Sequence, residues 1–409
     1  MREPKILAPD EWPFDAGVDG AERHRRSDAL SGDLFTDTAG QSVIFRGEDD
    51  VNRLLRDRRM GAVAMPILQM SGVTHGPLFE LWSVLMFGKD GDEHARLRKP
   101  IAPEFQSKAI ERYRAGMRSN ASALLDAAEE RGREAIEVWS EYALPLVSLS
   151  ACEMVGIPAA DAAKVGQWSV DLVAGFFLMD KNMLAKTEAA ATAFVAYLNN
   201  LLERKREDPA DDIASRLLGI GPGEPIEHDL SDVELVALLA NLVFGGLEAT
   251  AKVITTGVYH LQKESSWSAL VEEPALMPTA VSELLRFAPP VGMARYATED
   301  LATDDVSLAA GQLAMLTIDA ASKDPRKYEC PMQLQLDRTP GRQIAFGAGP
   351  HFCLGANLAK VILEVAFAEL TQRYPAARLH EEDGEAVWDY DTFHGITHLT
   401  LTLRGASGL

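Results

Sequence analysis

A single cysteine lies in a segment whose spacing could activate its thiol. Residues 346–355 read Phe-Gly-Ala-Gly-Pro-His-Phe-Cys-Leu-Gly, and an amphipathic segment follows directly. Gly347 and Gly349 permit a tight loop with unusual backbone angles before Cys353, and Gly355 removes side-chain bulk after it. The sulfur is therefore predicted to lie at a helix N-terminus, where the helix dipole and free backbone N–H groups lower the pKa of a thiol. The resulting thiolate is the form of cysteine that ligates a metal.

Two other roles compete for such a segment. A lone cysteine is usually a small buried hydrophobic residue, and a glycine-rich loop before a helix can bind phosphate. The segment lacks the G-x-G-x-x-G spacing of a dinucleotide-binding fold and the GK[ST] ending of a P-loop. The residues by themselves leave a metal ligand and a buried structural cysteine both open.

Charged residues at helical spacing are the next candidates. Glu283 and Arg286 lie three residues apart, so they share a helical face on which an ion pair can form. At this spacing a surface salt bridge is the alternative. His94 and Arg98 lie four residues apart on one face, and Arg295 follows a double-proline break.

These groups need long elements to position them. The longest candidate helix, residues 231–262, starts with Ser231 and Glu234 in the S-x-x-E pattern of a capping box. A continuous helix of this length would span roughly 45 to 50 Å at about 1.5 Å per residue, which is enough to cross the domain. Gly245 and Gly246 lie at its middle, where glycine costs on the order of 1 kcal/mol relative to alanine. The pair predicts a close approach to the helix backbone at that point.

Helical periodicity dominates the rest of the chain. Segments with apolar residues at three- and four-residue intervals are 108–130, 161–176, 183–206 and 357–374. Two-residue alternation is confined to short pieces around 313–318 and 399–403. No linker or repeat interrupts the patterning, so the sequence predicts a mainly α chain with minor β structure in a single domain, residues 1–409.

Composition and charge limit the partners. The 409 residues are 47% hydrophobic, as in a globular enzyme, and the net charge of −21 would repel nucleic acid. The apolar run 233–251 contains two glutamates and an asparagine, so we expect a buried helix and no membrane span. The first residues lack the apolar core of a signal peptide, and the three cysteines form no C-x-x-C pair, which argues against disulfides and structural zinc. A soluble, cytoplasmic protein is expected.

The cysteine segment resembles the haem-binding signature of the cytochrome P-450 family, F-G-x-G-x-H-x-C-x-G, and matches every fixed position. Three more family motifs occur in the family's order: H-x-x-x-R at His94 and Arg98, a central I-helix motif at 245–250, and E-x-x-R at Glu283 and Arg286. Together they cover most of the chain from about residue 90 to 360. The resemblance implies the cytochrome P-450 fold, which is mainly α, with a long central I helix over a haem and small β sheets at the periphery.

The resemblance also assigns residues to a cofactor, haem b. Cys353 is implied as the axial ligand of the iron, in a loop that includes Phe346, Gly347 and Gly355. Electron donation from a thiolate to haem iron favours cleavage of an O–O bond. The residues implied to bind the two propionates are His94, Arg98, Arg295 and His351. A buried network that braces the cysteine loop is implied for Glu283, Arg286 and Arg338.

The central helix departs from the family at one position. The family carries [AG]-G-x-[DE]-T, in which the acid and the threonine hydroxyl support proton delivery to dioxygen. Here Gly245 and Glu248 match, whereas Ala249 replaces the threonine and Thr250 follows, rotated about 100° around the helix. Three explanations are open: a water held by the Gly245 carbonyl and Glu248, a substrate hydroxyl, or a local distortion that turns Thr250 inward. We favour the water.

Helical geometry places one stripe of the central helix on a single face, and the resemblance turns this stripe toward the distal side of the haem. Its members are Asn241, Phe244, Gly245 and Ala249. The camphor hydroxylase group, to which the chain is similar, shares the sequence GGL followed by an acid. Asn241 is expected either to offer the substrate a hydrogen bond or to be a satisfied core amide. Further pocket positions implied by the family are Val291, Met293, Ile396 and Thr397, and residues 65–87 and 176–179 are candidates for a lid or for ordinary packing.

The implied reaction inserts one oxygen atom of O2 into a C–H bond of a small, mostly apolar molecule. No flavin or iron–sulfur sequence is appended, so a separate ferredoxin and its reductase are expected to supply electrons. Residues that could form a docking patch for the donor are Arg96, Lys99, Arg342 and Lys360. Two alternatives stay open: a peroxide-dependent haem peroxygenase, which the presence of Glu248 disfavours, and a haem-thiolate protein without oxygenase activity.

Overall fold

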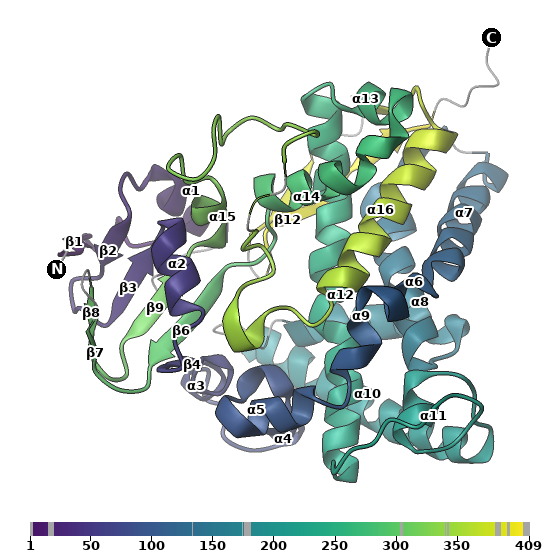
Figure 1. The fold of residues 1–409 in the computed structure, drawn as a ribbon, viewed down its shortest axis with the longest axis horizontal. Coiled ribbons are helices and arrows are strands. Elements are labelled where there is room, and N and C mark those ends of the chain that lie inside the picture. The colour runs from purple at the N-terminus through teal and green to yellow at the C-terminus, as the bar shows by residue number, and fades with distance from the viewer. Residues whose placement is uncertain are drawn as a thin grey trace.

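One long helix runs through the middle of the molecule. In the computed structural model, α12 spans Asp232–Lys263 without interruption. The capping box is confirmed: the Ser231 side chain accepts from the backbone N–H of Glu234, and the Glu234 carboxylate accepts from the backbone N–H of Ser231. Helices surround α12 (Figure 1). The structure describes residues 3–14, 20–132, 134–173, 175, 181–302, 306–339, 341, 343–380, 386–390 and 393–403.

The other helices are mostly gathered on one side of the molecule (Figure 1). They are α1 Gly20–Ala29, α2 Glu48–Leu54, α3 Ala64–Met70, α4 Pro77–Val84, α5 Gly91–Arg98, α6 Ser107–Glu111, α7 Arg114–Glu130, α8 Leu144–Val155, α9 Ala162–Val173, α10 Lys181–Glu207, α11 Ile213–Leu217, α13 Trp267–Glu272, α14 Met277–Phe287, α15 Ile318–Ser322 and α16 Ala356–Arg373. The neighbours that pack on α12 are α8, α9, α10 and α16, and their contacts bury most of its apolar residues.

The strands form one sheet of moderate size and three small ones. The six-stranded sheet lies toward the N-terminal end of the molecule (Figure 1) and has the order β1 Lys5–Ile6, β2 Leu34–Thr36, β3 Ser42–Phe45, β9 Leu313–Leu316, β6 Met293–Ala297 and β4 Met60–Ala62. The smaller sheets join β10 Arg378–Leu379, β13 Thr400–Thr402 and β5 Ala135–Glu137; β11 Val387–Asp389 and β12 Gly395–His398; and β7 Leu301–Ala302 and β8 Ser307–Leu308. Strand β12 lies against α12.

The predicted mainly α fold with minor β structure is confirmed, and most predicted elements appear with shifted ends. Segments 183–206, 231–262 and 357–374 correspond to α10, α12 and α16. Segment 108–130 is divided between α6 and α7, segment 161–176 is helical as α9, and the pieces at 313–318 and 399–403 contain β9 and β13. Ile318 was expected at the end of a strand, but it begins α15 instead.

Only α12, among the residues that the structure describes, is long and apolar enough to cross a membrane by length and composition. Of its most apolar window, 61% is buried inside the protein. The buried helix predicted from the run 233–251 is therefore confirmed.

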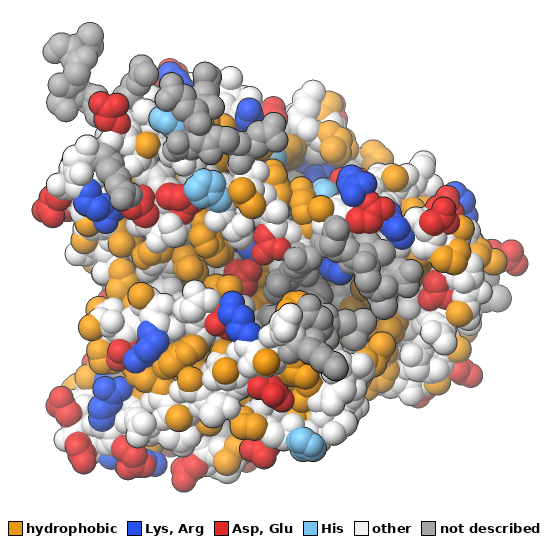
Figure 2. Space-filling model, turned by 180° about the vertical axis from the view of Figure 1, so that it is seen from behind, with side chains coloured by type: hydrophobic (Ala, Val, Ile, Leu, Met, Phe, Trp, Pro, Cys, Tyr) orange, Lys and Arg blue, Asp and Glu red, His pale blue; other side chains and the backbone are white. Residues whose placement is uncertain are grey.

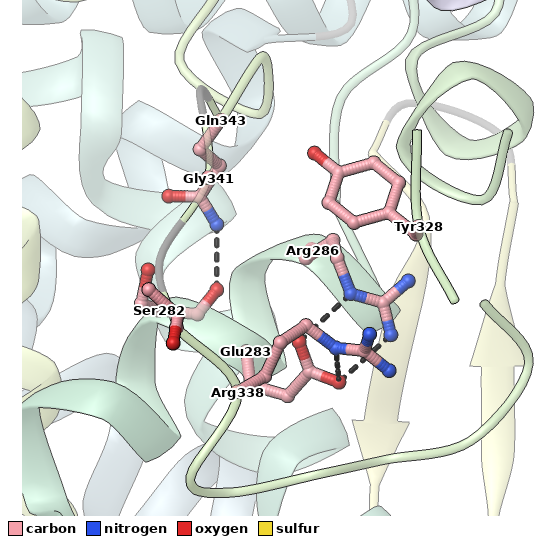
Figure 3. A pocket seen from close by; sticks show the side chains of 8 residues that line it. Ser282, Glu283, Arg286, Tyr328, Arg338, Gly341 and Gln343 are labelled. Atoms are coloured by element: carbon pink, nitrogen blue, oxygen red, sulfur yellow. Dashed lines mark hydrogen bonds and ion pairs between the residues drawn. The ribbon is translucent and has the colours of Figure 1, made fainter. Parts of the chain in front are cut away.

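A polar cluster holds the segment that follows α15 against α14 (Figure 3). Arg286 donates two hydrogen bonds of 2.8 Å to the Glu283 carboxylate, and Arg338 donates one of 3.1 Å. Glu283 and Arg286 are each 3% exposed. Arg286 also donates to the backbone carbonyls of Ser322 and Pro331 at 3.1 and 2.9 Å. A buried charge pair of this kind is stable only because each remaining donor and acceptor finds a partner.

We expect Glu283→Ala to destabilise the fold by about 3 to 5 kcal/mol, because it leaves the buried Arg286 guanidinium without its counter-charge. Equilibrium urea denaturation measures the loss. The matched control is Glu203→Ala, since Glu203 pairs with Arg206 at the same three-residue spacing but is 71% exposed. This control should change stability by no more than about 0.5 kcal/mol. Equal effects of the two substitutions would contradict a supporting role for the cluster.

Candidate functional site

The loop before α16 presents Cys353 in the manner that its glycines predict. Gly347 and Gly349 have φ angles of 72° and 69°, in the left-handed region that favours glycine. A Cβ at Gly349 would lie 2.4 Å from the carbonyl oxygen of Leu55, so any larger residue would clash with backbone. The backbone N–H of Cys353 donates to the Phe346 carbonyl at 2.9 Å and closes the loop. The N-cap of α16 follows two residues later, at Gly355.

The electrostatics of the thiol differ from the prediction. Burial raises the pKa of Cys353, while the backbone N–H of Gly355 and the Arg98 guanidinium act in the opposite direction. The predicted lowering by the helix N-terminus is present through the Gly355 N–H, but desolvation outweighs this amide and the nearby cation. A metal cation bound to the sulfur would reverse this balance, since a coordinating thiol is deprotonated outright.

A cluster of basic residues lies beside the cysteine. The His94 and His351 rings are 4.3 Å apart between centroids, and His351 Nε2 is 2.9 Å from Asp90 Oδ1. Burial lowers the pKa of His94 to about 4, helped by His351 and Arg98, so this ring is neutral near pH 7. Arg98 donates to the Phe352 carbonyl at 2.7 Å. The structure therefore brings His94 and Arg98 next to the cysteine loop, which contains His351.

Two arginines in this region form no ion pair within the described part of the chain, although Asp90 is close enough to raise the pKa of Arg295. Arg295 extends from β6 and donates to the carbonyl of Ala294 at 2.8 Å, but neither it nor Arg98 forms an ion pair with a carboxylate there. Burial lowers the pKa of both guanidinium groups. Partly buried cations without carboxylate partners are costly unless an anionic ligand approaches them. This donor set fits a ligand with two carboxylates, such as the propionates of a haem.

The middle of α12 is exposed, although both halves of the helix are buried. Gly245 and Gly246 are exposed and Ala249 is half-buried, while Phe244 and Leu247 are fully covered. A Cβ at Gly245 would lie 2.9 Å from Asn241 Nδ2, so the amide group of Asn241 lies directly over this glycine. A Cβ at Gly246 would meet nothing within 4 Å. A flat group could therefore approach the helix backbone closely at this turn, which fits a haem.

The Glu248 side chain is buried, whereas Gly245 and Gly246 are exposed. Its carboxylate accepts from the Lys252 ammonium at 2.8 Å through Oε1, while Oε2 is buried without a hydrogen-bond partner among the described residues. Thr250 is buried, and α12 is regular through this turn. The helix shows no distortion at Thr250, and the water and the substrate hydroxyl both stay open as explanations.

The predicted pocket residues fall into two groups by exposure. Asn241, Val291, Met293 and Thr397 are partly exposed, whereas Phe244 and Ile396 are fully covered. The Phe244 ring stacks on Trp82 at 5.7 Å and meets Phe87 edge-on at 6.1 Å, so it supports the pocket from behind. Asn241 Oδ1 is buried and has no hydrogen-bond partner. Of the lid and docking candidates, residues 176–179 and Arg342 lie outside the described residues.

Two residues near the site were missed from the sequence: Lys252 and Asp389. Lys252 is fully buried and its ammonium lies 2.7 Å from Asp389 Oδ2. A signal for Lys252 was present, because this lysine interrupts an otherwise apolar and small-residue run in the second half of the central helix. Nothing local marks Asp389, which is 137 residues away in the chain.

Comparisons with known proteins agree with this site. The sequence profile of the cytochrome P-450 family matches residues 267–389. The chain is 34% identical over 309 residues to mycinamicin IV hydroxylase/epoxidase of Micromonospora griseorubida, covering 74% of this chain and 75% of that protein. It is 31% identical over 319 residues to 6-deoxyerythronolide B hydroxylase of Saccharopolyspora erythraea, covering 77% of each.

A solved structure extends the likeness to almost the whole fold. The crystal structure of CalO2 superposes with a TM-score of 0.86 at 25% identity and covers 97% of this chain and 99% of its own. The relatives named here are bacterial oxygenases whose family carries a cysteine-ligated haem. The chain therefore belongs to the cytochrome P-450 family and is a monooxygenase of that family.

Proposed function

We propose that this monooxygenase inserts one oxygen atom of O2 into a C–H bond of a small, mostly apolar organic molecule. Electrons reach it from a ferredoxin and its reductase. The observation that carries the proposal is the Cys353 thiol, held by a constrained loop at the start of α16, with Arg98 beside it and Arg295 near His94, neither of which forms an ion pair in the described chain. The thiol would ligate the haem iron, and the two arginines would pair with the two propionates of the haem.

The cofactor in this proposal is haem b with Cys353 as the axial ligand. The chain has no C-x-x-C-H motif, so the porphyrin is held without covalent attachment. When bound, a thiolate-ligated haem activates dioxygen. Arg98 and Arg295 would neutralise the propionates, and His94 and His351 would donate hydrogen bonds to them. Phe346, Gly347 and Gly355 would keep the loop closed around the sulfur.

In this proposal, the turn of α12 that contains Gly245 and Glu248 delivers protons to the active site. Because Ala249 has no hydroxyl, a water between the Gly245 carbonyl and the free Oε2 of Glu248 takes the place of the usual threonine. Burial raises the pKa of Glu248 and the Lys252 ammonium opposes this rise. A carboxyl group with a raised pKa is better suited to donate a proton near neutral pH.

The substrate in this proposal is compact and apolar, with one group that donates a hydrogen bond. Asn241 Oδ1 is buried without a donor, so a substrate hydroxyl or amine at this position would satisfy it. Val291, Met293 and Thr397 would supply the partly exposed, mostly apolar wall. Phe244 and Ile396 would support that wall from behind.

A separate electron donor is expected to approach on the cysteine side. Phe352 in the cysteine loop is 42% exposed, so this loop reaches the protein surface. Lys99 is exposed nearby, Lys360 lies over the Phe346 ring, and Arg96 is already paired with Glu234. Acidic and basic side chains are interspersed on the face shown in Figure 2. We infer a soluble, cytoplasmic enzyme with no nucleic-acid or membrane partner, consistent with a net charge of −21.

Replacing the ligand tests the core of the proposal. The reduced, carbon-monoxide-treated protein should show the red-shifted absorption of a thiolate-ligated haem, and Cys353→Ser should abolish it, because only sulfur donates enough charge. Cys152→Ala is the control, since Cys152 is buried and its pKa is raised to about 12 by burial. The absorption of a histidine-ligated haem in the unsubstituted protein, or no bound porphyrin at all, would overturn the assignment.

The electron source is tested by supplying different oxidants. We expect turnover of a bound substrate with NADH, a ferredoxin and its reductase, and about 100-fold less with hydrogen peroxide alone, because acid-assisted O2 activation is the task of Glu248. Product formation measured by mass spectrometry gives both rates. Equal turnover with peroxide would favour the peroxygenase alternative, and turnover with neither oxidant would favour a protein without oxygenase activity.

A hydroxyl introduced at position 249 tests whether a water replaces the usual threonine in proton delivery. Ala249→Thr should change the fraction of electrons lost to hydrogen peroxide, because the new hydroxyl displaces or competes with the proposed water at Gly245. The ratio of NADH consumed to hydrogen peroxide formed measures this coupling. Thr250→Ala is the control on the buried neighbouring position and should leave the ratio unchanged. An identical ratio in Ala249→Thr and the unsubstituted enzyme would remove position 249 from the proton path.

A further inference from the structure

Lys252 is a fully buried cation in the second half of α12. Its ammonium contacts three acceptors: Glu248 Oε1 at 2.8 Å, Asp389 Oδ2 at 2.7 Å and the Phe393 carbonyl oxygen at 2.7 Å. A buried ammonium is costly unless each of its three donors is matched, and here all three are. The lysine therefore occupies a site built for a cation between two carboxylates.

The cluster leads from the interior of the protein to its surface. The Glu248 side chain is 4% exposed and that of Lys252 is 0% exposed, whereas the Asp389 side chain on β11 is 28% exposed. Each step between these groups is within hydrogen-bond distance. A continuous polar path therefore runs from solvent at Asp389 to the acid in the middle of α12.

Strand β12 holds this path in place. A Cβ at Gly395 would lie 2.7 Å from the Cβ of Lys252, so only glycine lets the strand lie directly on the lysine stem. The backbone N–H of Ile396 donates to Thr256 Oγ1 at 3.0 Å, which fixes the strand one turn further along α12. Contacts between α12 and β12 are extensive, and the two elements lie together in Figure 1. The lysine thus has little freedom to leave its three acceptors.

The charges around Lys252 favour a proton on Glu248. Glu248 and Asp389 both contact the one Lys252 ammonium, so a proton on Glu248 would remove one of the two negative charges that face each other there. Burial raises the pKa of Glu248, and the negative charges of Asp389 and Asp171 raise it further. The Lys252 ammonium lowers the same pKa and so opposes them. On α9, Asp171 is itself paired with Lys186 of α10 at 2.7 Å. His394, close to Lys252, is neutral near pH 7 because burial lowers its pKa to about 4.

We propose that Asp389 and Lys252 form a proton relay that loads Glu248 from solvent. Asp389 takes a proton from water; Lys252 passes one of its own protons to Glu248 Oε1 and regains one from Asp389. The ammonium and the Asp389 carboxylate are restored, Glu248 is protonated, and no electrons move. Lys252 and Asp389 are relay and positioning residues in this scheme. It rests on the proposed function, in which Glu248 supplies protons for oxygen activation.

The relay is tested by infrared spectroscopy of the ferric holoprotein without substrate. The carboxylic acid band of Glu248 is assigned by its loss in Glu248→Gln. Asp389→Asn keeps an acceptor for Lys252 but removes one negative charge, so the band should titrate about one pH unit lower or more. Transfer into D2O then measures how fast a deuteron reaches Glu248, and this exchange should be at least about tenfold slower without the Asp389 carboxylate.

Two further variants separate the relay from a merely structural contact. Asp389→Glu should restore both the titration and the exchange rate, because it restores a carboxylate. Asp161→Asn should change neither, since Asp161 also contacts a lysine and has a similar exposure of 26%, but it lies in the short 3₁₀ turn before α9 and its lysine partner is Lys164. An unchanged exchange rate in Asp389→Asn would overturn the relay. The carbon-monoxide absorption of the same samples tests haem ligation separately, so failure of the relay and failure of the proposed function are distinguished.

Discussion

In the proposed function, the sulfur of Cys353 carries a negative charge in a place where burial opposes that charge, and the surrounding loop is arranged to hold the sulfur there. Desolvation raises the pKa of the thiol, and only one amide and Arg98 act against it. The position of the sulfur is therefore secured by backbone geometry: two left-handed glycines, a closing hydrogen bond from Cys353 to Phe346, and a helix that starts two residues later. Deprotonation is left to the metal, which the loop is shaped to meet.

The central helix also buries a charged group. Most of α12 is apolar and is covered by α8, α9, α10 and α16, yet it carries the buried acid Glu248 at its middle. Glu248 is tolerated there because Lys252 lies one turn along the same helix and its ammonium is matched by three acceptors. Gly245 and Gly246, just before Glu248, leave the helix backbone exposed at this turn.

Sequence patterns were informative where the determinants are local. The capping box of Ser231 and Glu234, the glycine geometry around Cys353 and the pairing of Glu283 with Arg286 each depend on residues a few positions apart, and each appears in the structure. The split of 108–130 into α6 and α7 was not predicted, because apolar periodicity continues through the turn at Tyr113. The contact between Lys252 and Asp389 joins positions 137 residues apart, so no spacing rule could have found it.

The residues proposed for the cofactor and those proposed for the proton carry different charges. Near Cys353, Arg98 and Arg295 form no ion pair in the described chain, which suits a ligand that brings its own carboxylates. Near Glu248, two carboxylates contact one buried ammonium. In the proposed function, the first group would hold the anionic cofactor and the second would supply the proton. On that proposal, alanine in place of the family's threonine at position 249 is tolerable, because the cluster of Glu248, Lys252 and Asp389, and not a single hydroxyl, determines where the proton resides.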